Sequence, residues 1–278
     1  MKQASRWLLL TTISVILPAA GAAQEPSSAG NAAARIKIRE LRRFPAAEAT
    51  QGVAVDGRHF YAVGNHSIGK YDKKNGKRTA GWECPEGRPL IHLNSGVVHE
   101  GKLYCAHSNY PGVPMTSSIE IWDTESMRHI DHRSFGIYVG SATWVDFHKG
   151  FWYVAFAHYA NRAAEPNRDP RWTTILQFDR AWNRLQGWVF PGALLERFAP
   201  SSNSGGVFTG EGLLYCTGHD APEIYVMKFP EGGSTLEWVE TLGFASPGQG
   251  IALDPYEPGL LYSIHKANRE VIVSQISP

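Results

Sequence analysis

Residues 92–109 read HLNSGVVHEGKLYCAHSN, which is a short apolar strand, a turn with glycine, a second strand and a polar cluster. The same order of features occurs five times along the chain of 278 residues. In the first repeat an Asn75-Gly76 pair, a strong signal for a tight hairpin, separates the third and fourth expected strands. Four short strands repeated every 45 residues or so, that is at about the spacing of propeller blades, are typical of a β-propeller.

Each repeat predicts one blade, in which alternating apolar residues are interrupted by Gly, Asn or Asp turns. The expected strands cover residues 51–55, 60–63, 67–72 and 78–82, then 96–99, 102–106, 118–123 and 128–133, then 142–146, 151–157, 174–179 and 184–190, then 205–208, 213–217, 223–227 and 236–242, and finally 250–253, 260–264 and 270–274. A helical turn is expected at 193–198.

The fifth repeat is one strand short, whereas residues 36–41 form an amphipathic strand with no partner nearby in the sequence. Pairing these two would close a ring and remove two exposed sheet edges. The sequence therefore predicts an all-β chain, a single β-propeller of five four-stranded blades whose last blade is completed by the N-terminal strand. Six blades, or a β-sandwich, are the alternatives.

The N-terminus has the pattern of a secretory signal peptide. Lys2 and Arg6 precede an apolar run at 7–17, and Ala20-Gly21-Ala22 is a cleavage signal. We expect a signal peptide at 1–23, a disordered lead-in at 24–34 and the propeller at 35–278. The apolar run is too short for a typical membrane-spanning helix. We therefore expect a secreted or periplasmic monomer that does not insert into a membrane after cleavage of the signal.

Composition narrows the partners. Hydrophobic residues make up 43% and charged residues 19%, which is typical of a folded domain. The net charge of +1 gives no reason to expect nucleic-acid binding. Cys105 and Cys216 each follow a tyrosine at the same position of separate repeats, too far apart for a disulfide. We expect both to be small buried apolar side chains.

In a propeller the first strand of each blade lies innermost and the second runs antiparallel beside it, so the start of one and the end of the other reach the same mouth. Polar residues gather at these places. The histidines near ends of second strands are His66, His107, His158, His219 and His265. Of these, His158 is also expected to bind a substrate. The other polar residues expected there to do so are Gln51, Asn94, Ser95, Asn109, Asn203, Asp220 and Gln249. Small residues on the inner strands, such as Gly52, are expected to serve packing near the axis.

Long connections reach the same face, and clustered long loops often carry function. Tyr110 and Tyr159 lie in two of them and could wall a substrate. The alternative is that this face carries long loops but binds no ligand, and that the repeats share the histidines for packing alone.

Histidine is the natural acid or base near neutral pH, and Asn, Gln and Ser can hold developing negative charge. His107 and His219 are the expected acid–base pair because each is flanked by other polar residues. Neutral imidazoles also bind transition metals, so one divalent metal ion held by His66, His107, His158, His219 and His265 is an optional cofactor. Few acidic residues are expected at this mouth, which disfavours a glycosidase carboxylate pair and a calcium site.

The phrases Thr50-Gln51-Gly52-Val53 and Tyr71-Asp72-Lys73-Lys74-Asn75-Gly76 look like the opening of glutamine cyclotransferases. Over residues 35 to 276 the chain resembles the exported β-propeller proteins that include those enzymes, lactonases and lactone-forming cycloisomerases. The resemblance implies a lactonase, cycloisomerase or lyase that opens, closes, isomerises or eliminates a small hydroxylated or lactone-like substrate. The second interpretation is a non-catalytic module that binds a carbohydrate or a peptide, and the third is a scaffold for another protein.

Overall fold

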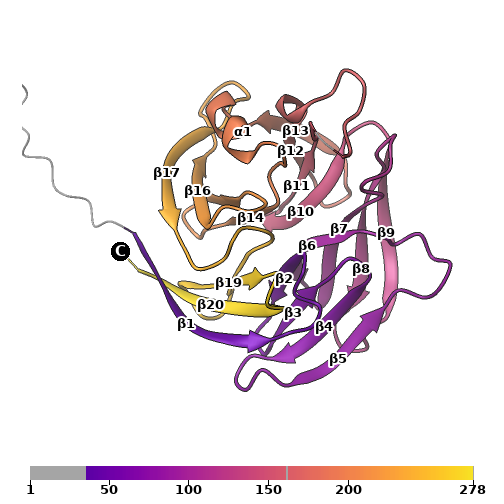
Figure 1. Cartoon of the computed structure of the whole chain (residues 1–278), viewed down its shortest axis with the longest axis vertical. Helices are drawn as coiled ribbons and strands as arrows, with labels where there is room; N and C mark the ends of the chain where they lie inside the picture. The colour runs from indigo at the N-terminus through magenta and orange to yellow at the C-terminus, as the bar shows by residue number, and fades with distance from the viewer. Residues whose placement is uncertain (1–35, 161, 278) are drawn as a thin grey trace, which may run out of the picture. The chain divides into compact units, whose positions relative to one another are not determined.

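The computed structural model describes residues 36–160 and 162–277. The predicted signal peptide and lead-in lie outside these residues. In the described part of the chain, twenty strands form five antiparallel sheets of four strands each, arranged as the blades of a β-propeller (Figure 1). The predicted fold class and number of blades are therefore confirmed.

Four blades are continuous in sequence, and in each the strands follow one another outward from the axis. They consist of β2 (Gly52–Val55), β3 (His59–Val63), β4 (Ser67–Asp72) and β5 (Arg78–Glu83); β6 (Leu93–His99), β7 (Lys102–Ser108), β8 (Ser117–Asp123) and β9 (His129–Gly136); β10 (Ser141–His148), β11 (Phe151–Ala157), β12 (Thr174–Phe178) and β13 (Arg184–Val189); and β14 (Gly205–Phe208), β15 (Leu214–Thr217), β16 (Glu223–Lys228) and β17 (Glu237–Gly243). The expected helical turn is α1 (Gly192–Phe198), and a 3-10 turn covers Pro170–Trp172.

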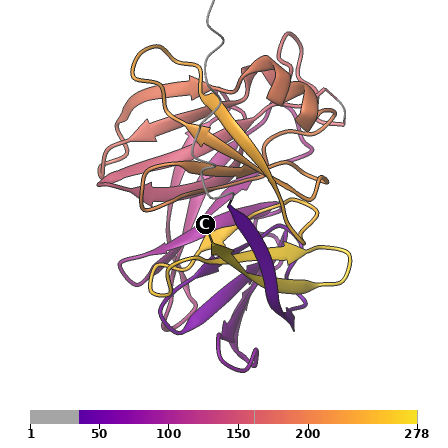
Figure 2. The same cartoon turned by 90° about the vertical axis from the view of Figure 1, so that its left-hand side faces the viewer.

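The fifth blade joins the two ends of the described chain. It contains β18 (Ala252–Leu253), β19 (Leu260–His265), β20 (Glu270–Ser277) and the N-terminal β1 (Lys37–Pro45). β1 pairs antiparallel with β20 from Lys37 opposite Ser277 to Pro45 opposite Glu270. Indigo β1 lies beside yellow β20 in Figure 1 and Figure 2. The predicted closure of the ring by the N-terminal strand is confirmed.

Side chains tie this last blade to the first. Phe44 of β1 stacks on Phe60 of β3 with ring centroids 5.3 Å apart. The Lys73 ammonium, only 4% exposed, lies 2.5 Å from Asp254 Oδ2 and 2.9 Å from Glu257 Oε1. Burial disfavours the charge of Lys73, but hydrogen bonds to these two carboxylates outweigh it and raise the pKa of Lys73. An apolar stack and a buried ion pair therefore join the blades at the seam.

The inner strands meet at the axis because their facing residues are small. A Cβ atom on Gly52 would lie 2.7 Å from Ser95 Cα, and one on Gly250 would lie 2.8 Å from Gly52 Cα. Real side chains do not approach a backbone this closely, so β2, β6 and the position two residues before β18 need glycine or serine here. This contact narrows the channel between its two mouths, and the expected packing role of these residues is confirmed.

The thiols of Cys84, Cys105 and Cys216 are free, and the latter two are fully buried in the packing between blades. This confirms the expected role of Cys105 and Cys216 as small apolar side chains. Within the described residues, no helix has the length and apolar character needed to cross a membrane.

Truncation of Phe44 tests the closure of the ring. We expect Phe44→Ala to lower the free energy of unfolding by about 3 kcal/mol, since it removes a buried aromatic ring that packs on the first blade. Leu41→Ala, on the same strand but 42% exposed, is the control and should cost under about 0.5 kcal/mol. Urea unfolding of both variants checks this, and equal small losses would contradict it.

Candidate functional site

We use the term histidine mouth for the end of the central channel at which the inner strands begin. One of its histidines is His92, a partly buried residue that directly precedes β6. Four side chains lie close enough to act on the charge of this ring: His107, Lys266, His66 and His219. Burial, followed by the positive charge of these neighbours, lowers the pKa of His92 to about 4. His92 is therefore a neutral imidazole at neutral pH, inside a cluster of basic groups.

His107, on β7, begins a hydrogen-bonded chain that runs through the second blade. Its Nδ1 lies 3.0 Å from Ser118 Oγ on β8. Ser118 donates its hydroxyl proton to Glu120 Oε1 at 2.5 Å, and Glu120 Oε2 lies 2.7 Å from His129 Nε2 on β9. A hydroxyl has one proton, so Ser118 can only accept from His107. Nδ1 of His107 therefore carries the hydrogen and Nε2 carries the lone pair.

That lone pair has no hydrogen-bond partner among the residues that the structure describes. His107 is 7% exposed, and its Nε2 is buried without a hydrogen bond. Burial lowers the pKa of His107, although the Glu120 charge and the nearby Pro89 carbonyl favour the protonated ring. The arrangement holds a neutral imidazole with an available lone pair, and it supplies two groups that stabilise the ring after it takes a proton.

His219 is more accessible than His107. It follows β15, and its Nδ1 lies 2.7 Å from Asp220 Oδ1. Gln249 donates from Nε2 to the His219 carbonyl at 3.0 Å and so fixes the backbone at this position. A carboxylate beside one ring nitrogen orients the imidazole and leaves Nε2 for another partner.

Aromatic side chains flank the cluster. The rings of His92 and Tyr110 have centroids 5.0 Å apart, and Tyr110 meets Tyr159 edge to face at 5.1 Å. Burial raises the pKa of Tyr159 to about 12, so its hydroxyl stays protonated and can donate a hydrogen bond. The structure thus brings both tyrosines to the histidine mouth.

Two histidines expected at this mouth are engaged elsewhere. His158 has its Nε2 3.1 Å from the Val139 carbonyl and its Nδ1 3.2 Å from Glu165 Oε2. His265 accepts from the backbone amide of Asn268 at 3.3 Å, within the β19–β20 turn. Within residues 36–160 and 162–277, no three or more His, Cys, Asp or Glu side chains form a group that could hold a metal ion. The side chains at this mouth therefore do not fit the optional metal.

Several amides expected to bind a substrate instead support the mouth. Asn203 is fully buried: its Oδ1 accepts from Trp144 Nε1 at 2.5 Å, and its Nδ2 donates to two backbone carbonyls. The Asn109 side chain stabilises its own loop by two hydrogen bonds: its Oδ1 accepts from the Thr116 amide, and its Nδ2 donates to the Pro114 carbonyl. The other bonds of this kind join Asn94 Nδ2 to the Ala142 carbonyl and Gln51 Nε2 to Asn65 Oδ1, and Ser95 packs at the axis.

Three residues of the cluster were missed in the sequence. His92 stands at the start of an inner strand, which is the signal used for Asn94, so the same rule could have found it. Lys266 follows His265 and lies at the same turn. Glu120 lies in the third strand of its blade. Only the strand register, which sets Ser118 opposite His107 and Glu120 opposite His132, shows that its side chain takes part in the hydrogen bonds that start at His107.

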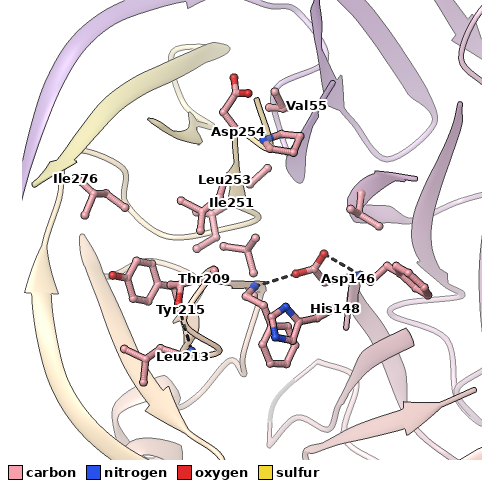
Figure 3. Close-up of a pocket in the computed structure, with 18 of the residues that line it drawn as sticks. Val55, Asp146, His148, Thr209, Leu213, Tyr215, Ile251, Leu253, Asp254 and Ile276 are labelled. Carbon is pink, nitrogen blue, oxygen red and sulfur yellow. Dashed lines mark hydrogen bonds between the residues drawn. The ribbon is translucent and has the colours of Figure 1, made fainter. Parts of the chain in front are cut away.

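The opposite mouth, where the inner strands end, holds a cavity of about 800 Å³ (Figure 3). Apolar side chains make up most of its wall, and Asp146 and His148 lie at the end of β10 among them. The sequence predicted no site at this end.

Comparison with known proteins identifies the fold. No family model matches the chain, and no curated protein sequence matches it. The glutaminyl cyclase of Myxococcus xanthus is 12% identical with a TM-score of 0.58, covering 87% of this chain and 97% of that chain. The PQQ-bound aldose sugar dehydrogenase of Streptomyces coelicolor is 12% identical with a TM-score of 0.56, covering 88% and 99%. A luciferin-regenerating enzyme is 10% identical with a TM-score of 0.51, covering 88% and 96%.

The chain is therefore a β-propeller whose architecture is shared with several enzymes. The expected resemblance to cyclotransferase-like and lactonase-like propellers is confirmed at the level of the fold.

The depressed pKa of His92 predicts acid sensitivity. An unfolded histidine takes up a proton near pH 6.5, whereas folded His92 does so only near pH 4. Stability is therefore fully present above about pH 6.5 and falls between there and pH 4, by about 2 kcal/mol over the first pH unit and a half. We expect His92→Gln to flatten this part of the profile, as measured by urea unfolding at pH 7 and pH 5. His132→Gln, at an exposed position, is the control, and equal slopes in wild type and His92→Gln would contradict the prediction.

Proposed function

We propose that this protein is an enzyme that transfers protons at the histidine mouth to open or close the ring of a small hydroxylated or lactone-like molecule. The observation that carries the proposal is the buried, unpartnered Nε2 of His107. A buried polar atom without a partner costs about 1–3 kcal/mol and is uncommon in folded proteins. A substrate or water that presents a hydrogen to this nitrogen explains why the cost is tolerated.

For lactone opening, His107 acts as the base. Water attacks the carbonyl carbon, and His107 Nε2 takes the proton that the water loses. Glu120, acting through Ser118, stabilises the resulting imidazolium, as its electrostatic effect on the pKa of His107 indicates. The bond between the carbonyl carbon and the ring oxygen then breaks, and His219, which starts the cycle protonated, gives a proton to that oxygen. The proton on His107 then passes through water to His219, which restores both rings. Ring closure is the reverse.

Negative charge develops on the carbonyl oxygen during attack. Lys266 supplies positive charge beside the cluster, and neutral His92 can donate a hydrogen bond without adding a second charge. Preorganised groups of this kind often provide the largest part of a rate enhancement. Tyr110 and Tyr159 would wall the substrate. With the signal peptide predicted at the N-terminus, we place this activity in the periplasm or outside the cell.

The second candidate is a non-catalytic module that binds a carbohydrate or a peptide. The contiguous rings of His92, Tyr110 and Tyr159 favour it, because a sugar or a peptide side chain can stack on such a face. It differs from the first candidate in needing no base, so the orientation of His107 by Glu120 would have no consequence for binding.

Turnover of a panel of five- and six-membered lactones, followed with a pH indicator, tests the proposal. We expect His107→Ala and His219→Ala each to lower kcat/KM by about 100-fold or more. Glu120→Gln should lower kcat by about tenfold with little change in KM and should shift the pH profile, because it alters the charge that stabilises protonated His107. His132→Ala, at an exposed position on β9, should leave turnover unchanged.

Hydrolysis that survives in both histidine variants would contradict the proposal. Absence of turnover for every lactone, together with a sugar or peptide that binds wild type and both variants equally, would support the binding module instead. Metal analysis of wild type and the double variant completes the test, since stoichiometric metal lost with the two histidines would assign them to a metal site.

A further inference from the structure

The cavity at the opposite mouth has the size and lining of a small-molecule site. Its volume of about 800 Å³ lies within the usual range of roughly 300–1,000 Å³ for ligand pockets. The inner strands of all five blades contribute to it. Its apolar wall includes Val55, Val97, Val207, Ile251, Leu253 and Ile276. This wall would bury the apolar body of a ligand.

One carboxyl group in this cavity has no counter-ion. Asp146 is 7% exposed, and each of its oxygens accepts one backbone amide, from Phe147 and from Phe208, both at 2.8 Å. The bond from Phe208 joins β14 to β10, whereas the bond from Phe147 stays within β10; both are drawn in Figure 3. No ion pair among the described residues includes Asp146. A buried carboxylate without a cation is costly.

The other buried acid in the cavity wall, Asp254, differs from Asp146 in having a counter-ion. Asp254 is paired with the buried ammonium of Lys73, so its charge is already balanced. For Asp146, burial raises the pKa to about 6, although the two amides oppose the shift. Each of its oxygens keeps a second lone pair that can accept a further hydrogen bond.

The remaining charged groups of the cavity do not balance Asp146. His148 stacks on Phe208 with centroids 4.4 Å apart, and burial lowers the pKa of His148, which favours its neutral form. Burial also lowers the pKa of His99 at the end of β6. Glu211 lies on the lining, and Lys149 lies beside Gly212 on the adjoining turn. The Asp146 carboxylate therefore lacks a cation that would balance its charge.

We propose that the opposite mouth is a binding site for a small organic cation, an amine with an apolar body. The ammonium group would donate to the free lone pairs of Asp146, and the body would lie against the valine, leucine and isoleucine wall. The rings of His148 and Phe208 would flank the charged end. This site lies beyond the contact of Gly52, Ser95 and Gly250 at the axis, and it needs none of the residues of the histidine mouth.

The probe is 2-phenylethylammonium, compared with the neutral 2-phenylethanol, titrated by calorimetry against the mature protein at pH 7.5. We expect the ammonium to bind about tenfold more tightly or better, since a hydrogen bond to a charged group adds this much. Asp146→Asn should bring the two affinities together. His107→Ala should leave both unchanged, which separates this test from that of the proposed function.

A second variant fills the cavity without touching Asp146. Gly210 lies on the lining, and a Cβ atom there would meet nothing within 4 Å. The Gly210→Phe variant should therefore fold and should bind both ligands more weakly. Gly232→Phe, in an exposed turn with equally free space and outside the lining, is the control and should have no effect.

The affinity should also fall with acid. As Asp146 takes up a proton below pH 6, wild type should lose about tenfold in affinity for the ammonium between pH 7.5 and pH 5, and Asp146→Asn should show no such loss. Three results would each overturn the proposal: no binding of the ammonium at millimolar concentration, equal affinity for the alcohol, or unchanged affinity in Gly210→Phe.

Discussion

The pairing of β1 with β20 is the constraint on which the rest of the molecule depends. Each blade buries its faces against its two neighbours, so an open ring would expose the faces of the first and last blades. The register from Lys37 to Pro45 places Phe44 over Phe60, and the Lys73–Asp254 pair lies at the same seam. Strand pairing, aromatic packing and a buried ion pair thus stabilise one closed arrangement, and both mouths exist only within it.

The contact at the axis gives the two ends of the channel different chemistry. Gly52 and Gly250 let the inner strands approach until backbone meets backbone. On one side, polar residues from strand starts and strand ends form a cluster of basic groups around His92. On the other, the apolar ends of the inner strands leave a cavity with the buried carboxyl of Asp146, which has no ion pair among the described residues. A ligand at one mouth need not share any residue with a ligand at the other.

Both candidate sites are marked by a buried polar group whose requirements the protein leaves unmet. His107 has an Nε2 without a partner, and Asp146 has a charge without a counter-ion. Some other buried groups are satisfied, as in Asn203, whose amide makes one hydrogen bond to Trp144 of blade three and two to backbone carbonyls of blade four. Others, such as Trp122 Nε1 and Tyr262 OH, also lack a partner among the described residues but lie away from both mouths. His107 and Asp146 differ from these in lying at a mouth of the channel, where a ligand could use the remaining hydrogen-bond capacity.

The repeated strand pattern alone determined the five blades, the closing strand and the small residues at the axis, because strand period, turn residues and blade length are local properties of the chain. It also placed His66, His107 and His219 at one mouth, since strand direction in a propeller is fixed by topology. Only the tertiary structure decided that His158 and His265 are engaged elsewhere, that Asn203 and Asn109 are structural, and that His92, Lys266 and Glu120 complete the cluster. Hydrogen-bond partners and uncompensated charges such as Asp146 depend on loop paths and on neighbouring blades, which no local pattern encodes.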